Sequence, residues 1–227
     1  MLIFHKMASQ TEENYLKSLF LLANAKGEIS LSDLSKSLEI SIPTANSMVN
    51  KLHEKGLLNY EKYKPLVLTA KGKKEAALII RKHRLTEMFL VEFMRFGWEQ
   101  VHDIAEQIEH INSQIFFERM DELLAFPTID PHGSPIPDKN GKISWKSYEK
   151  FSDCKVGQVV KLAALTNSSS DFLKFLNSKE LSLGLKLKIL SVEEFDKSMI
   201  VSYENHKLEQ FSQVVCERLL VDVSKTI

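Results

Sequence analysis

The stretch from Ser30 to Leu58 decides the fold of the N-terminal part of the chain, and it reads S-L-S-D-L-S-K-S-L-E-I-S-I-P-T-A-N-S-M-V-N-K-L-H-E-K-G-L-L. We predict a short helix from Ser32 to Leu38, because a serine at its start can act as the N-cap. A tight turn through Glu39 to Ser41 follows. A second helix begins at Pro43, a favourable first-turn residue, and runs to Gly56. Two short helices joined by such a turn form a helix-turn-helix motif.

The second of these helices carries a polar outer face. The residues on this face are Thr44, Asn46, Ser47, Asn50 and Lys51, with Ser41 and Pro43 just before them. Polar side chains of this kind reach base edges and phosphates when a helix lies in the major groove of DNA. The pattern therefore favours a DNA-recognition helix. A plain helical hairpin whose outer face is only solvated stays open as the alternative.

The segment after the second helix predicts a two-stranded wing. Residues 57–60 and 66–69 are rich in strand-forming side chains, and they flank a charged turn that contains Pro65. Lys62 and Lys64 at the tip of this turn can meet phosphates, as contacts that position the protein without reading sequence. A recognition helix followed by a wing is a winged helix. We assign this DNA-binding domain to residues 1–72.

Further helices are expected before and after the winged helix, at residues 11–25, 69–94, 101–110 and 113–126. The last three have more apolar surface than one winged helix can cover. We therefore predict that residues 73–141 form a helical dimerisation domain that ends in a proline-rich linker. Packing of these helices on one another within a monomer is the alternative.

Two neighbouring helical segments carry a set of histidines and carboxylates. Val101 to His110 reads V-H-D-I-A-E-Q-I-E-H and Lys82 to Glu87 reads K-H-R-L-T-E. Residues three and four apart lie on one side of a helix, and the stripe from His102 to His110 is wide for one ion, so two sites are easier to build than one. One predicted site contains Glu106, Glu109 and His110, and the other contains His83, Glu87 and His102. Neutral imidazole with carboxylate suits first-row divalent metal ions. An ordinary solvated helix face remains the alternative.

Residues 127–141, P-T-I-D-P-H-G-S-P-I-P-D-K-N-G, form the clearest boundary in the chain. Four prolines and two glycines exclude a helix here. The segment also contains Asp130 and His132, an oxygen and a nitrogen ligand held on stiff backbone. A turn that contains histidine without any metal is the alternative interpretation.

The pattern changes to short alternating segments from about Cys154 onward. We predict strands at 157–163, 186–192, 199–203, 213–216 and 219–223, with a helical turn at 172–178. Five short strands in such a length fit a small β-barrel of the SH3 kind, which we assign to residues 150–227. Asp171 opens the helical turn as either a cap or a ligand. The expected fold is thus mainly α with a small β domain.

Composition limits the class of protein. The 227 residues are 44% hydrophobic, and 30 basic side chains balance 30 acidic ones, so any basic patch must be local. Cys154 and Cys216 lie far apart without a C-x-x-C motif, which favours buried thiols in a reducing compartment, with a disulfide as the alternative. The chain has neither a signal-peptide pattern nor an apolar run long enough to span a bilayer. We expect a cytoplasmic protein without a membrane partner.

The chain resembles the diphtheria-toxin-repressor or manganese-transport-regulator family of metal-dependent transcriptional repressors. The resemblance runs from Thr11 to the end, and the SH3-like domain marks the long form of the family. It depends on E-x-Y-L at 13–16, S-x-P-T at 41–44, L-T-x-x-G at 68–72, R-K-H-R-L-x-E at 81–87, V-H-D-x-A-E-x-x-E-H at 101–110 and P-H-G-x-P-I-P at 131–137.

The resemblance implies a set of metal ligands. The primary site of the family uses a residue of the first helix, here Asn14, with the positions of Glu106, Glu109 and His110. The ancillary site uses the positions of His83, Glu87 and His102, or in some members those of Glu87, Asp130, His132 and Asp171. Relatives have aspartate or methionine at the position of Asn14, and iron-type members have cysteine at position 106. A site without thiolate suits Mn(II) or Fe(II), and we favour manganese slightly.

The resemblance therefore implies a repressor that is activated by Mn(II) or Fe(II) and binds a palindromic, double-stranded DNA operator as a homodimer, with two metal sites per chain. It is not expected to be an enzyme. A metal-dependent hydrolase is a rival interpretation, but the chain has no H-E-x-x-H motif and no further acid–base or nucleophile set. A winged helix that serves only protein contacts, with structural metals, is a third interpretation.

Overall fold

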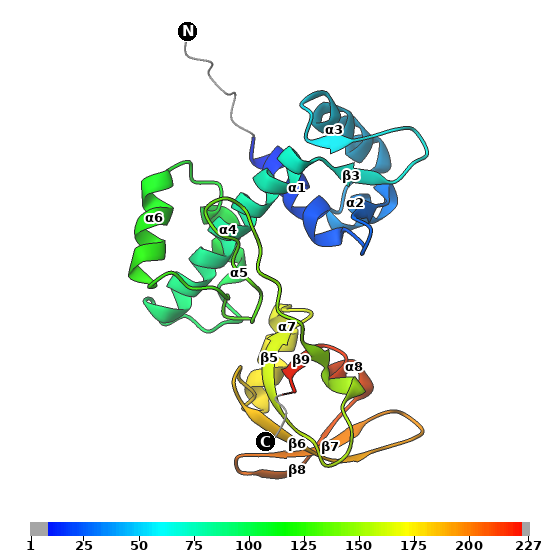
Figure 1. Cartoon of the computed structure of the whole chain (residues 1–227), viewed down its shortest axis with the longest axis vertical. Coiled ribbons are helices and arrows are strands. Elements are labelled where there is room, and N and C mark those ends of the chain that lie inside the picture. The colour runs from blue at the N-terminus through cyan, green and yellow to red at the C-terminus, as the bar shows by residue number, and fades with distance from the viewer. Residues whose placement is uncertain (1–8, 224–227) are drawn as a thin grey trace. The chain divides into compact units, whose positions relative to one another are not determined.

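The computed structural model describes residues 9–223, which divide into two compact units (Figure 1). The first unit runs through Thr86 and adds residues 105–123 and 136–144, and the second contains residues 87–104, 124–135 and the chain from Trp145 onward. The three domains expected at 1–72, 73–141 and 150–227 stay a prediction, and the ends of the first and last reach outside the described residues. None of the described helices is long and apolar enough to cross a membrane.

Three helices begin the first unit: α1 (Gln10–Leu22), α2 (Leu31–Ser37) and α3 (Ile42–Glu54). Each is preceded by a serine N-cap whose side chain accepts a hydrogen bond from the backbone amide three residues later. In α1 the backbone amide of Ser9 also donates to the Glu12 side chain. The helix-turn-helix is thus confirmed, with boundaries within about two residues of the predicted ones except at the end of α1. That helix ends at Leu22, before the turn that contains Gly27.

The wing is confirmed and gains a third strand. Strands β2 (Leu58–Asn59) and β3 (Leu66–Leu68) pair antiparallel, and β1 (Glu28–Ile29) pairs with the other edge of β3. With only two residues, β1 is too short to give a period-two pattern in the sequence. A single core formed by α1, α2, α3, the wing and the start of α4 joins these elements, with Leu16, Leu34 and Leu52 completely buried.

Three further helices follow: α4 (Ala70–Glu92), α5 (His102–Ile108) and α6 (Gln114–Leu123). Helical spacing in the sequence predicts an apolar side of α5 made of Ile104, Ala105, Ile108 and Ile111, and this prediction is partly wrong. Ala105 and the carboxylate Glu109 are both completely buried on the same side, whereas Ile111 is exposed. Because α5 ends at Ile108, Ile111 does not lie on the buried side of that helix. Glu109 can be buried because charged side chains contact its carboxylate.

The second unit contains a six-stranded antiparallel sheet in the order β4-β9-β5-β6-β7-β8. Its strands are β4 (Glu149–Lys150), β5 (Val159–Leu165), β6 (Lys186–Val192), β7 (Met199–Tyr203), β8 (His206–Phe211) and β9 (Leu219–Asp222). The sheet and α7 (Ser170–Ser178) enclose a second core around Leu162, Leu176 and Leu187. Shifts of register within β5, β6 and β7 bend the sheet around this core (Figure 1).

Two predictions for this unit are wrong. Residues 213–216 form the short helix α8 (Gln213–Cys216) instead of a strand, because the Ser212 side chain caps the turn by accepting from the Val215 amide. Strand β8 was not predicted. It is an edge strand in which only Phe211 is buried, so its sequence lacks the apolar alternation of a half-buried strand.

The expected absence of a helix at residues 127–141 agrees with the structure of these described residues. Cys154 and Cys216 are buried free thiols, as expected. Their burial raises the pKa of Cys154 to about 11 and that of Cys216 to about 12, so neither is a reactive thiolate at neutral pH.

Candidate metal centre and nucleic-acid interface

A cluster of charged side chains joins α1 to α5 within the first unit. Lys17 Nζ lies 2.5 Å from Glu106 Oε1, and it lies 2.7 and 3.0 Å from the two carboxylate oxygens of Glu109. Glu109 is completely buried. Its burial alone would raise its pKa, but the bond from His83 and the charge of Lys17 lower the pKa below the ordinary value. Glu109 is therefore a buried carboxylate that stays ionised.

Two histidines complete the cluster, and one of them, His83, contacts a different group of residues than the one to which we assigned it. His83, which we assigned to the second site, has its Nδ1 2.6 Å from Glu109 Oε2 of the first. His110 has its Nδ1 2.5 Å from Glu13 Oε2 and its Nε2 3.7 Å from Glu109 Oε1. The Glu13 carboxylate accepts from Nδ1 of His110, which leaves Nε2 directed toward Glu109. A carboxylate behind a ligating histidine is the usual arrangement in metal sites.

Asn14 lies on α1 between these contacts, one residue after Glu13 and three before Lys17. Its Oδ1 is buried and has no hydrogen-bond partner among the described residues. A buried polar atom without a partner costs about 1–3 kcal/mol, so such atoms usually have a function. An amide oxygen, two carboxylates and an imidazole, such as Asn14, Glu106, Glu109 and His110 offer, are donors that would suit a divalent ion such as Mn(II) or Fe(II).

A second cluster lies within the second unit. Ligand atoms of Glu87, Asp130 and His132, all three buried, lie within 4.8 Å of one another. His132 Nε2 lies 2.9 Å from the carbonyl oxygen of Trp98, to which it can only donate, and its Nδ1 lies 3.8 Å from Glu87 Oε2. Nδ1 of His132 thus faces a carboxylate. Imidazole nitrogens and carboxylate oxygens grouped in this way are possible ligands of a cation.

The proline-rich turn positions this second cluster. Asp130 Oδ1 accepts hydrogen bonds from the backbone amides of His132 and Ser134, both at 2.9 Å. The carbonyl of His132 accepts from the Leu165 amide of β5 at 3.0 Å. Both candidate ligands of the turn, Asp130 and His132, are therefore fixed by backbone hydrogen bonds.

The structure places the other two candidates of this set differently. His102 is exposed, and its Nδ1 lies 3.6 Å from Glu87 Oε1. Asp171 is not the cap of α7, since Ser169 precedes that helix. The Asp171 side chain is fully exposed, and its carboxylate lies 4.0 Å from Lys174 Nζ. Asp171 is thus a solvated residue of the first turn of α7.

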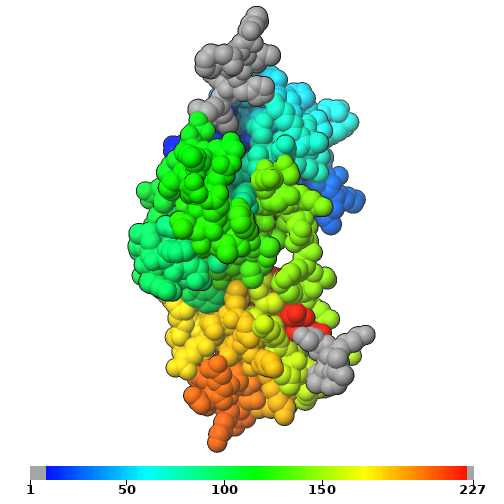
Figure 2. Space-filling view, turned by 60° about the vertical axis from the view of Figure 1, so that its left-hand side comes forward, coloured from blue at the N-terminus to red at the C-terminus, as the bar shows by residue number. Residues whose placement is uncertain are grey.

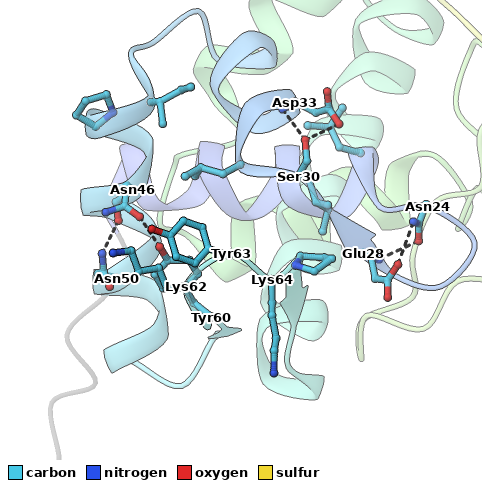
Figure 3. A pocket seen from close by; sticks show the side chains of 16 residues that line it. Asn24, Glu28, Ser30, Asp33, Asn46, Asn50, Tyr60, Lys62, Tyr63 and Lys64 are labelled. Atoms are coloured by element: carbon cyan, nitrogen blue, oxygen red, sulfur yellow. Dashed lines mark hydrogen bonds between the residues drawn. The ribbon is translucent and has the colours of Figure 1, made fainter.

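Five of the nine candidate DNA-contacting residues line a groove between α3 and the wing: Pro43, Asn46, Asn50, Lys62 and Lys64. Figure 3 shows Asn46, Asn50, Lys62 and Tyr63 gathered on one side of this groove. Ser41 caps α3 and Pro43 lies in its first turn, and the candidates of α3 are exposed except for Asn46, which is half-buried. The Tyr60 hydroxyl donates to Asn46 Oδ1 at 2.7 Å, which fastens the wing to α3. At the tip of the wing, Lys64 pairs with Glu61 and Lys62 lies over the ring of Tyr63.

The α3 helix is also bound to α1, through a residue that the sequence did not single out. Glu12 Oε1 lies 2.6 Å from Lys55 Nζ and 3.0 Å from Lys51 Nζ, and Glu12 is almost completely buried. Burial by itself would raise its pKa, but the two lysines and the Ser9 amide lower it to about 2. Lys51, one of the DNA candidates, is thus held by an ion pair. The same α1 therefore carries both the metal candidate Asn14 and a contact to α3.

Comparisons with known proteins now assign the family. The N-terminal DNA-binding domain of the iron-dependent repressors matches residues 7–66, and their metal-binding and dimerisation domain matches residues 69–138. The HTH-type transcriptional regulator MntR of Bacillus pumilus is 33% identical over 120 residues, which are 53% of this chain and 83% of MntR. The chain belongs to the iron-dependent repressor family.

Other members of the iron-dependent repressor family agree with this assignment. The iron-dependent repressor IdeR of Mycobacterium leprae is 35% identical over 56% of this chain. That match spans 55% of IdeR, so this chain matches just over half the length of its mycobacterial relatives. A solved manganese-dependent transcriptional repressor in complex with manganese has a TM-score of 0.85 at 28% identity, and covers 94% of this chain and 100% of its own. These relatives are transcriptional regulators, and the last of them confirms the predicted fold with an SH3-like domain.

The Glu12 contact gives a testable prediction for this family member. Replacing Glu12 by Gln should lower the free energy of unfolding by about 1–2 kcal/mol, because a buried carboxylate loses its charge while the partly exposed lysines become hydrated instead. Urea unfolding of the metal-free protein measures this. Glu61→Gln removes the exposed pair with Lys64 and should change stability by less than about 0.5 kcal/mol. Equal effects of the two substitutions would contradict the buried role of Glu12.

Proposed function

We propose that the protein is a transcriptional repressor that binds a palindromic, double-stranded operator as a homodimer when a divalent metal ion is bound between α1 and α5. The observation that supports this is the buried Oδ1 of Asn14, which has no hydrogen-bond partner within residues 9–223 and lies on the same helix as Glu12 and its ion pairs to α3. Asn14, Glu106, Glu109 and His110 are the proposed ligands. When bound, the ion would supply a positive charge that attracts the amide oxygen of Asn14 and the carboxylate oxygens of Glu106 and Glu109.

The residues of the chain then explain how metal and DNA binding are coupled. Glu13 holds the start of α1 against His110, and Asn14, the next residue of α1, would be joined to Glu109 and His110 through the ion. Glu12 transmits the position of α1 to the end of α3. In a dimer the distance between the two α3 helices must match half-sites about one helical turn apart. Metal binding needs to favour one position of α1 by only a few kcal/mol to shift the equilibrium between two spacings of the α3 helices.

The proposal favours Mn(II) over Fe(II), with two sites per chain. The first donor set contains no thiolate, and its carboxylate, amide and imidazole groups suit manganese. Glu87, Asp130 and His132 form the proposed second site. His83 contacts Glu109 of the first site, and His102 contacts Glu87 of the second. The proposed DNA contacts are those of α3 and the wing. Such a regulator acts on DNA in the cytoplasm.

The decisive experiment measures operator binding and metal binding together. Operator fragments are selected from random double-stranded DNA with the Mn(II)-loaded protein, and affinity is then measured with and without Mn(II). Wild-type protein should bind at least tenfold more tightly with Mn(II). His110→Ala should lose this dependence and weaken Mn(II) binding at least tenfold, because a ligand and the link to Glu13 are removed.

A matched control is His206→Ala. His206 also pairs with carboxylates, Glu180 and Glu209, but lies in the C-terminal sheet. It should keep both the operator affinity and its dependence on Mn(II). Operator binding that is unaffected by Mn(II) in the wild type, or by the His110 substitution, would refute the proposed function.

A further inference from the structure

Lys17 has no role in the function proposed so far, yet it occupies the centre of the first cluster. Its ammonium group has three N–H donors, and the three nearest acceptors are Glu106 Oε1 and both oxygens of Glu109, at 2.5 to 3.0 Å. Its side chain is only 10% exposed. All the hydrogen-bonding capacity of a buried ammonium is thus directed to two of the proposed metal ligands.

The oxygens that Lys17 contacts are those that a metal ion would need. Glu109 Oε1 lies 2.7 Å from Lys17 Nζ and is also the oxygen that faces His110 Nε2. Glu106 has its Oε1 on the ammonium as well. A divalent cation bound by these atoms would lie close to a like charge in a poorly solvated place, where repulsion is strong. The ammonium and the ion therefore exclude each other.

The charges of the cluster explain why an internal cation is present. The Glu109 carboxylate is completely buried, and that of Glu106 is partly buried, with Lys17 in contact with both. Without a cation these two carboxylates would repel each other and lose the solvation of water. Lys17 supplies that cation from α1, the same helix that carries Asn14.

We propose that Lys17 is a built-in counter-ion that stabilises the metal-free cluster, that a divalent ion must displace, and that thereby sets the metal affinity of the repressor. This inference depends on the proposed function for the place of the ion. According to this inference, Lys17 has opposite effects on the metal-free and the metal-bound protein. The residue stabilises the metal-free protein and weakens metal binding, whereas a merely structural lysine would do only the first.

The experiment compares Lys17→Met, which keeps the length of the side chain without its charge, with the wild type. Thermal unfolding of the metal-free proteins and isothermal titration with MnCl₂ are measured on the full chain. We expect a lower melting temperature for Lys17→Met without metal. We also expect Mn(II) to bind at least tenfold more tightly, so that saturating Mn(II) raises its melting temperature more than that of the wild type. Lys17→Gln, which retains hydrogen-bond donors, is measured as well in case the Met variant does not fold.

Lys179→Met is the matched control. Lys179 also pairs with a largely buried carboxylate, Glu209, but this pair belongs to the second unit and Glu209 is not a proposed ligand. This variant should lose stability without metal and keep the Mn(II) affinity of the wild type. If the wild type binds Mn(II) and neither Lys17 variant binds it more tightly, the counter-ion role is refuted and the proposed function stands. If neither the wild type nor any variant binds Mn(II), both are refuted.

Discussion

An Ile115→Asp variant is expected to be monomeric at protein concentrations at which the unmodified chain forms dimers. Ile115 lies in α6, in the segment that matches the dimerisation domain of the family, and its side chain is 68% exposed in the isolated chain. Three further large apolar residues are exposed in α6 and just before it, namely Ile111, Phe116 and Leu123. The side of the first unit that contains α6 faces the viewer in the green area of Figure 2. An exposed apolar group of this size is typical of an interface.

The expected effect is large for two reasons. Burying one isoleucine side chain contributes about 1.5–3 kcal/mol, and a carboxylate in its place must also be desolvated. In a twofold dimer the substitution occurs in both copies of the same surface. The dissociation constant of the dimer should therefore rise at least about 100-fold. Operator affinity should fall with it, because a palindromic site needs two recognition helices.

Sedimentation equilibrium over a range of concentrations measures the dimer constant. Leu208→Asp is the control, since Leu208 is 77% exposed but lies on the edge strand β8. It introduces the same charge at a similarly exposed position outside the matched dimerisation segment. An Ile115→Asp protein that still sediments as a dimer would place the interface elsewhere.

The winged helix could be predicted from the sequence because each local signal agrees with the fold. Serine caps, a proline in the first turn of α3 and apolar residues at helical spacing all indicate the same boundaries. Where one signal was missing, the prediction failed. Strand β8 has polar residues on both faces, and α8 is a single turn defined by the hydroxyl of Ser212, which a run of valines does not reveal.

The candidate metal centre could be predicted only in part. Helical spacing grouped Glu106, Glu109 and His110 into one predicted set, because these residues lie within five positions of the sequence. Spacing could not show which residues of a distant helix approach that set. His83 contacts Glu109 across 26 positions, and Lys17 does so across 92. The presence of Lys17 one turn after Glu13 on α1 was a signal, but a lysine near carboxylates usually indicates a solvated ion pair.

A Gly133→Ala variant is expected to lose the second metal site while it keeps the first. Gly133 follows His132 in the proline-rich turn and has a φ of +86°. That conformation costs an alanine about 1–2 kcal/mol. A Cβ atom at this position would also lie 2.3 Å from the Ala163 carbonyl oxygen and 2.5 Å from the Ala164 Cα. Both are backbone atoms of β5, which is paired to β6 on one side and to β9 on the other, so β5 cannot yield.

The turn must therefore move away from β5. This movement breaks the bond from the Leu165 amide to the His132 carbonyl and displaces both Asp130 and His132 from Glu87. Steric strain, the unfavourable φ and the lost bond together amount to about 3 kcal/mol or more against the native position of the turn. Titration with MnCl₂ should then show one ion per chain in the variant and two in the wild type.

Gly157→Ala separates the two causes of this effect. Gly157 has a nearly identical φ of +88°, but a Cβ there has no described atom within 4 Å. This control carries the conformational cost without the clash, so it should lose only about 1–2 kcal/mol of stability and still bind two ions. If Gly133→Ala also binds two ions, then Asp130 and His132 are not ligands, since the turn that positions them cannot remain in place beside β5 with a methyl group at residue 133.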